Sequence, residues 1–135
     1  MDLSTHGIVA LVRNNDGQFL LLKESRDLLN GAWAPPHGRC ESSDMSEEDG
    51  VVREVKEETN LDVVPIKKLL TQPADTKVKT VSFWLVDVLG GDLIVDPGES
   101  SDSGWFGLEE CLKQNLYPGT KIFFEKVKSG EIVLD

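Results

Sequence analysis

Cysteine is scarce in this sequence, since only Cys40 and Cys111 occur among 135 residues. Two thiols are too few for a disulfide framework, and no Cys-x-x-Cys pair offers ligands for zinc. Long apolar runs are also lacking, because the longest, residues 7–12 and 19–22, fall far short of a bilayer span. The N-terminus has no basic flank typical of a signal peptide. We therefore expect a soluble, cytoplasmic protein with reduced thiols and no membrane partner.

Positive charge is scarce as well: 14 Lys and Arg face 24 Asp and Glu, which gives a net charge of −10 at pH 7. This excess opposes docking on duplex nucleic acid, so we expect none as a partner. With 39% hydrophobic residues, the chain can close one apolar core but hardly two, which predicts a single domain over residues 1–135. The oligomeric state stays open. If the protein handles an anionic ligand, clustered carboxylates that hold hard cations would attract it.

Short apolar runs separated by turn residues predict strands in the first and middle parts of the chain. The first two runs flank Asn14-Asn15-Asp16-Gly17, whose residues tolerate positive φ, so we expect a β-hairpin there. Two prolines within residues 33–38 forbid helix and predict a rigid loop or edge segment. The predicted strands cover residues 5–13, 18–23, 61–71 and 78–89, and a last one ends at Trp105-Phe106.

Helical periodicity is strongest over residues 46–59, where polar residues crowd the start and Asn60 can take the left-handed cap. Residues 108–114 and 120–128 also show helical patterns, the second beginning just after Pro118-Gly119. Strands on both sides of one strong helix, with more helix at the end, indicate an α/β fold in which a mixed β-sheet is packed between helices.

Three glutamates share one face of the predicted central helix. At 100° per residue, Glu54, Glu57 and Glu58 fall within an arc about 100° wide, while Val52 and Val55 point toward the core. Like-charged pairs at these spacings destabilise a helix by a few tenths of a kcal/mol each unless cations lie between them. Mg²⁺ or Mn²⁺ would supply that compensation, because hard cations prefer carboxylate oxygens. The alternative is an ordinary solvated acidic face.

The surrounding residues favour the metal site, because they resemble the box of the Nudix hydrolase family: Gly, five residues, Glu, seven residues, then Arg-Glu-hydrophobic-x-Glu-Glu-x-Gly-hydrophobic. The matching residues are Gly38, Arg53, Glu54, Val55, Glu57, Glu58 and Leu61. The resemblance implies an α/β/α sandwich over nearly the whole chain and a Mg²⁺ or Mn²⁺ cofactor. It also implies metal ligation by Glu54, Glu57, Glu58 and the carbonyl of Gly38, with Arg53 pairing the glutamates and Glu54 and Glu57 acting in catalysis.

A further acid in many relatives lies on a loop well after the box and serves as ligand or general base. Glu99 is the candidate for this catalytic role, and Asp75 and Asp102 are weaker ones. Without such a role, Glu99 is a surface loop acid.

Two positions depart from the box. One extra residue separates Gly38 from Arg53, so the first glutamate position falls on Asp44, or on Met45 when counted back from Arg53. We expect this change to affect the loop more than the metal ligands. Asn60 replaces the closing glycine, which we expect to matter little because Asn tolerates the left-handed conformation.

Residues 33–38, Trp-Ala-Pro-Pro-His-Gly, are similar to the Trp-x-Pro-Pro-Lys-Gly segment of diadenosine polyphosphate hydrolases in the same family. His37 stands where those proteins have lysine, and His37 and Arg39 are the candidate substrate-binding residues. The alternative for His37 is an exposed loop histidine without a role. For the aromatic residues Trp33, Phe83, Trp84, Trp105 and Tyr117 we favour core packing over stacking on a nucleobase. We expect His6 to be structural and Cys40 to take no part in the chemistry.

The resemblance implies a metal-dependent pyrophosphohydrolase in which water attacks a phosphoanhydride bond of a small nucleotide, such as a dinucleoside polyphosphate or a nucleoside triphosphate. A second hypothesis is a Nudix-like domain that senses a nucleotide or ADP-ribose without cutting it. Three mutually repelling glutamates beside Arg53 favour the enzyme. An acidic protein-interaction module would explain neither the spacing nor the loop.

Overall fold

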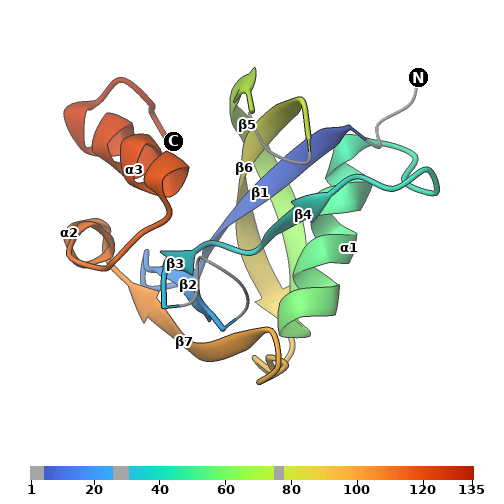
Figure 1. Ribbon diagram of the computed structural model, residues 1–135, viewed down its shortest axis with the longest axis horizontal. Helices are drawn as coiled ribbons and strands as arrows, with labels where there is room; N and C mark the ends of the chain where they lie inside the picture. Colours follow the sequence, from blue (N-terminus) through green and yellow to red (C-terminus); the bar gives the residue numbers. More distant parts are fainter. Residues whose placement is uncertain (1–4, 26–30, 75–77) are drawn as a thin grey trace.

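The computed structural model describes residues 5–25, 31–74 and 78–135. Two sets of elements flank the long central helix α1 (Glu47–Thr59) in the chain (Figure 1). Before α1 come the strands β1 (His6–Arg13), β2 (Phe19–Glu24), β3 (Trp33–Ala34) and β4 (His37–Arg39). After it come β5 (Asp62–Pro73), β6 (Thr80–Gly90), β7 (Ser100–Phe106), α2 (Leu108–Leu112) and α3 (Pro118–Ser129).

The described residues form a seven-stranded mixed sheet whose centre is β1. Along its whole length β1 pairs in parallel with β6, which pairs antiparallel with the edge strand β5. On its other side β1 pairs with β4 through Gly7 to Val9, and with β2 only at Arg13 and Phe19. The predicted hairpin is therefore correct at its turn, but the two strands diverge. The short strand β4 fills the space that this divergence opens.

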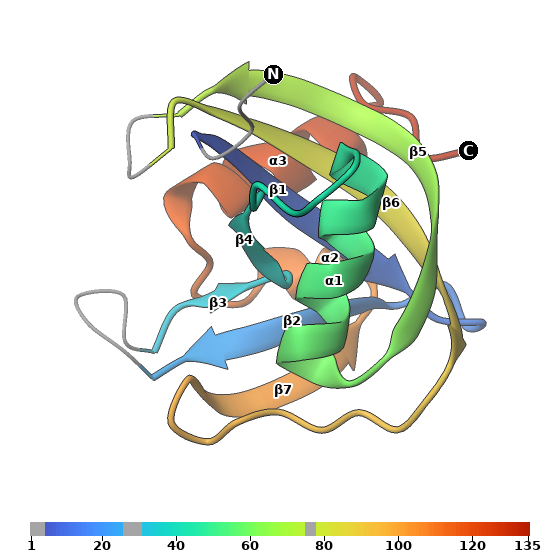
Figure 2. The ribbon, with the colours of Figure 1, turned by 90° about the vertical axis from the view of Figure 1, so that its right-hand side faces the viewer.

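Helices cover both faces of the sheet (Figure 2), as predicted. The even-numbered residues of β1, such as Ile8, Ala10 and Val12, face α1 and pack with its Val51 and Val55. On the opposite face a second cluster joins the strands to α2 and α3, with members that include Leu11, Phe83, Leu85, Phe123 and Phe124. This division follows from the alternation of side chains along a strand.

Helix α1 has the ends that the sequence predicts. The Ser46 hydroxyl accepts a hydrogen bond from the Asp49 amide at 3.1 Å, and Asn60 closes the helix in the left-handed region with φ of 66°. The inward face differs from the prediction: Val51 is buried, whereas Val52 is 37% exposed, so the assignment of Val52 to the core was wrong. The buried positions of the last two turns are Val51, Val55 and Thr59, a strict four-residue spacing.

Element ends shift by a few residues elsewhere. Helix α3 begins at Pro118 itself, because proline suits the first helical position, where its missing N–H costs nothing. Helix α2 ends at Leu112 rather than Gln114. No helix within the described ranges is both long and apolar enough to cross a membrane.

Candidate metal and substrate site

The site is centred on the contact between Gly38 of β4 and Glu54 of α1. A β-carbon at position 38 would overlap the carboxyl group of Glu54, so glycine is the residue that lets this carboxyl group lie directly against the strand. Pairing of Gly38 with Ile8 of β1 holds the strand in place. The structure therefore brings together the first residue of the predicted motif and its first helical glutamate.

Arg53 is the hub of the acidic cluster. Its Nη1 lies 3.0 Å from Glu54 Oε1, 3.2 Å from Glu57 Oε2 and 3.3 Å from Glu41 Oε1. Its Nη2 donates to the carbonyl oxygen of Arg39 at 3.1 Å. One guanidinium thus links α1 to β4 and to the loop between them.

Asp44 occupies the position left ambiguous by the extra residue. Its two carboxylate oxygens accept hydrogen bonds from Arg53 Nε at 2.9 Å and Nη2 at 3.0 Å, and the Glu41 amide donates to Oδ2 at 2.8 Å. The side chain of Asp44 is only 4% exposed, while Met45 is 90% exposed. Of the two alternatives, Asp44 is therefore the acid that supports the loop. Gly50 makes room for it, since a β-carbon there would lie 3.0 Å from Asp44 Oδ2.

The carboxylates around Arg53 differ in charge balance. The hydrogen bonds from Arg53 hold the pKa of Asp44 below its ordinary value. Burial raises the pKa of Glu54, and the nearby charges of Glu57 and Glu41 raise it further, so that the opposing effect of Arg53 is outweighed. The positive charge of Arg53 is therefore not enough to offset the burial of Glu54 and the negative charges beside it.

Glu58 lines a small pocket beside the acidic cluster. Its lining includes His37 from β4, Glu24 at the end of β2, Ser100 at the start of β7 and Tyr117 just before α3. This pocket joins the acidic face of α1 to the candidate substrate-binding histidine. Sequence reasoning did not identify Glu24, which lies in no recognisable motif. For Tyr117 it favoured core packing, whereas the structure places this residue in the pocket lining and in neither core cluster.

The remaining predicted residues lie around this centre. Arg39 is exposed at the end of β4, on the same side of that strand as His37. Glu99 is exposed in the turn before β7; its amide donates to the Asp96 carbonyl, and its own carbonyl accepts from the Ser25 amide. Glu99 therefore flanks the pocket through its neighbour Ser100.

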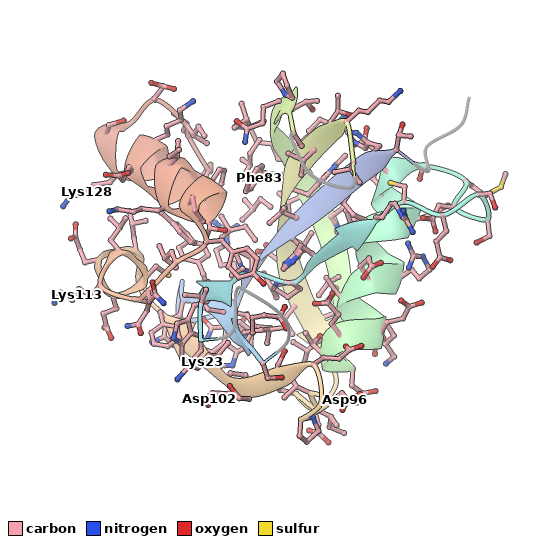
Figure 3. The ribbon with its side chains drawn as sticks, viewed as in Figure 1. Lys23, Phe83, Asp96, Asp102, Lys113 and Lys128 are labelled. Atoms are coloured by element: carbon pink, nitrogen blue, oxygen red, sulfur yellow. The ribbon has the colours of Figure 1, made fainter. Side chains whose placement is uncertain are left out.

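The weaker acidic candidate Asp102 lies outside this cluster. Asp102 lies on β7 opposite Lys23 of β2, as Figure 3 shows, and its carboxylate accepts from the Ser103 amide. Asp75 lies outside the described residues.

A second polar cluster, unforeseen from the sequence, surrounds Glu47 at the start of α1. Lys68 Nζ donates to Oε2 at 2.7 Å, while Trp84 Nε1 and His6 Nε2 lie 3.2 and 3.1 Å from Oε1. Burial favours the neutral acid, but hydrogen bonds from Lys68, Trp84, Ser82 and His6 overcome it and lower the pKa of Glu47 to about 2. His6 is thus structural, as expected, and helps to tie α1 to the sheet.

The other aromatic residues and the thiols are part of the packing. Phe83 and Trp84 are buried in the two cores, and Trp33 and Trp105 are partly buried against them. Cys40 is buried near the acidic cluster, and burial raises the pKa of its thiol to about 11. A thiol that stays protonated at neutral pH fits the expectation that Cys40 takes no part in the chemistry.

The acidic cluster has donors suited to a hard cation, namely carboxylates beside the main chain of Gly38. Glu54 could hold such an ion together with Glu57, Glu58 and the Gly38 carbonyl. In the part of the chain that the structure describes, however, no three His, Cys, Asp or Glu side chains converge closely enough to enclose a metal ion. Glu57 instead contacts Arg53, and Glu58 lines the pocket.

Comparisons with known proteins connect this geometry to a family. Residues 4–127 match the model of the NUDIX domain. The asymmetrical bis(5'-nucleosyl)-tetraphosphatase of Sus scrofa is 31% identical over 126 residues, which cover 88% of this chain and 84% of that protein. Putative nudix hydrolase 1 of Caenorhabditis elegans is 33% identical over 109 residues, or 80% of this chain. The chain spans only 29% of the C. elegans protein.

Solved structures agree on the fold. The MutT protein of Methanosarcina mazei Go1 superimposes with a TM-score of 0.75 at 29% identity, covering 94% of each chain. An Ap4A hydrolase from C. elegans, solved as a binary complex, gives a TM-score of 0.73 at 23% identity and covers 94% of this chain and 97% of the other. At that identity the second likeness concerns the fold alone.

Proposed function

The chain belongs to the Nudix family, and from this premise we propose that it is a metal-dependent pyrophosphohydrolase acting on a phosphoanhydride bond of a nucleoside-diphosphate-linked substrate. The observation that carries the proposal is the setting of Glu54. Its side chain is 14% exposed and its carboxyl group packs against Gly38. Among the described residues it shares one guanidinium, that of Arg53, with Asp44, Glu57 and Glu41. A hard cation bound there would supply the positive charge that this acid lacks.

The proposed metal ligands are Glu54, Glu57, Glu58 and the carbonyl oxygen of Gly38. A divalent cation bound by them supplies positive charge to the diphosphate and makes a water more acidic. Arg53 holds Glu54 and Glu57 at fixed positions through Nη1, and Asp44 holds Arg53. These contacts keep the acids in place before a substrate arrives, which is how a preorganised site lowers a reaction barrier.

His37 is proposed to contact the phosphate chain in the pocket that it shares with Glu58, and Arg39 from the exposed end of β4. Glu99 is proposed as the loop acid that assists as ligand or general base. Its support is its place beside Ser100, which lines the same pocket as Glu58. The cleavage we propose is direct attack by water, without a covalent intermediate on the protein.

For the substrate we propose a small nucleotide, with dinucleoside polyphosphates first and nucleoside triphosphates second. Two observations support this order: the Sus scrofa relative is named a bis-nucleosyl tetraphosphatase and matches over 84% of its length, and residues 33–38 resemble the loop of such enzymes. Other relatives are named for ADP-ribose and NAD-capped RNA. A panel of diadenosine polyphosphates, nucleoside triphosphates, ADP-ribose and nucleotide sugars, assayed with Mg²⁺ and with Mn²⁺, separates these substrates.

Glu57→Gln tests the assignment of the acids. Glu57 is 56% exposed, so its charge serves the site rather than the packing, and we expect turnover to fall by about 100-fold or more with an unchanged melting temperature. Glu125→Gln, an exposed glutamate on α3, is the matched control and should keep full activity. Undiminished hydrolysis by folded Glu57→Gln at saturating Mg²⁺ would refute the assignment.

A further inference from the structure

His37 and Tyr117 come from opposite halves of the chain and meet in the pocket beside Glu58. Their ring centroids lie 5.4 Å apart at an interplanar angle of 68°, which is an edge-to-face pair. No sequence motif relates these two residues, which are 80 positions apart (117 − 37). Their contact is made by the folded chain alone.

The hydrogen bond of His37 determines which ring nitrogen can meet a ligand. Nδ1 lies 2.9 Å from the carbonyl oxygen of Pro35. A carbonyl only accepts, so Nδ1 must carry a proton and donate it. Nε2 is then the nitrogen that can contact a ligand. Pro35 and Pro36 are buried, so the main chain that presents the imidazole is stiff on that side.

Tyr117 is anchored at its main chain and at its hydroxyl. Its amide donates to the Trp33 carbonyl at 3.0 Å, and the Trp33 amide donates to the Asn115 carbonyl at 2.7 Å. Its hydroxyl donates to Glu24 Oε2 at 2.9 Å. A ring held at both ends gives the neighbouring imidazole a fixed surface to pack against.

The geometry points to Tyr117 as a positioning residue: its ring sets the plane of the His37 imidazole, so that Nε2 meets the diphosphate of a nucleotide in the site. This role rests on the proposed function, because the ligand is the nucleotide of that proposal. The effect passes through His37, so a loss of the Tyr117 ring should weaken nucleotide binding only while the imidazole is present.

The test is a double-mutant cycle of Tyr117→Leu and His37→Ala, with Tyr117→Phe as the conservative variant. We expect Tyr117→Leu to raise KM about 2- to 10-fold, the range that an aromatic pair accounts for, with a smaller change in kcat. Tyr117→Phe keeps the ring and its main-chain anchor but loses the hydrogen bond to Glu24, so its KM should lie between those of wild type and Tyr117→Leu. In the His37→Ala background, Tyr117→Leu should change KM no further. The carbon-bound ring protons of His37 should shift more in the NMR spectrum of Tyr117→Leu than in that of Tyr117→Phe.

Phe106→Leu is the matched control. Phe106 forms another edge-to-face pair, with Trp33, at the same centroid distance of 5.4 Å, but it does not line the pocket. Its loss should lower the melting temperature without raising KM. An equal rise of KM in Phe106→Leu, or an undiminished effect of Tyr117→Leu without His37, overturns the positioning role.

The proposed function and the positioning role can fail separately. If the wild type cleaves no member of the nucleotide panel, the proposed function falls, and the same cycle is then measured as the dissociation constant of ADP. The coupling between positions 37 and 117 should appear in that constant too. Absence of coupling, or of ADP binding, overturns the role of Tyr117.

Discussion

Glu47 and Glu54 lie on the same helix, about two turns apart, and their side chains are similarly buried, at 19% and 14% exposure. Their pKa values are shifted in opposite directions. The pKa of Glu47 is lowered to about 2, whereas the pKa of Glu54 is raised. Burial acts in the same sense on both, so the difference arises from their partners.

Glu47 has several donors of its own, from β1, β5 and β6, and they include the ammonium of Lys68. Among the described residues Glu54 has one cationic partner, Arg53, which it shares with Asp44, Glu57 and Glu41. A carboxylate with all its bonds made within the fold stabilises that fold, while one left short of positive charge is suited to a cation from outside. The first is a structural anchor and the second a site.

Asp44→Ala removes one of the carboxylates that share Arg53 with Glu54. Of the proposed substitutions, it should have the largest effect on stability. The loss of a buried, two-pronged pair with Arg53 should lower the free energy of unfolding by about 3 kcal/mol. Urea denaturation measures this loss. Met45→Ala is the control, because its side chain is 90% exposed and should leave stability unchanged. Equal stability of the two variants would remove Asp44 from the account of the loop.

Glu54→Gln tests whether Glu54 serves the functional site rather than the stability of the fold. We expect activity to fall about 100-fold or more, as for the loss of one preorganised electrostatic group in a reacting site. Because burial already disfavours the charged form of Glu54, the melting temperature should stay the same or rise. Steady-state kinetics and a melting curve on one sample decide the matter. A clear drop in melting temperature would make Glu54 an anchor like Glu47.

Glu47→Gln tests whether Glu47 stabilises the fold. It should lower stability and leave activity unchanged, the reverse of the result expected for Glu54→Gln. An amide cannot accept from Lys68 as a carboxylate does, so the free energy of unfolding should fall by about 2 kcal/mol, as for hydrogen bonds to charged groups. Activity per folded molecule should remain near wild type. Loss of activity without loss of stability would place Glu47 in the functional site, and the difference in role between Glu47 and Glu54 would no longer hold.

The smallest expected effect is on the decrease of the free energy of unfolding at acidic pH. The folded-state pKa of Glu47 lies below its ordinary value of 4.5, so its contribution is complete above pH 4.5 and is lost as pH falls toward about 2. Wild-type stability should therefore decline more steeply over that range than the stability of Glu47→Gln. Unfolding free energies at matched pH values measure the two slopes. Parallel slopes would mean that the pKa of Glu47 is not lowered by folding.

Much of α1 could be predicted from neighbouring residues alone. Ser46 and Asn60 carry its ends, because capping depends on side chains within one turn of the helix. The inward face was less predictable: the pattern placed Val52 in the core, but the structure buries Val51. Both choices leave a plausible apolar stripe on the helix, and only the sheet against which it packs decides between them.

The candidate site divides in the same way. The spacing of Glu54, Glu57 and Glu58 predicted one acidic helical face, and Gly38 and Arg53 were matched to the same motif. Neither spacing nor motif could show that Asp44 rather than Met45 supports the loop, since counting from either end of the motif gives a different answer. The bonds between Asp44 and Arg53 exist only because the loop folds back along α1.

By itself the sequence determined the α/β class, the helix with its caps and the acidic motif, since each depends on residues within a few positions of one another. The tertiary structure alone decided which acid is anchored and which is short of positive charge, and that His37 meets Tyr117. Those outcomes depend on the register of β4 and β6 beside β1 and on how α1 and α3 lie over the sheet. Interactions between residues far apart in the chain follow from that register, and local pattern carries little information about it.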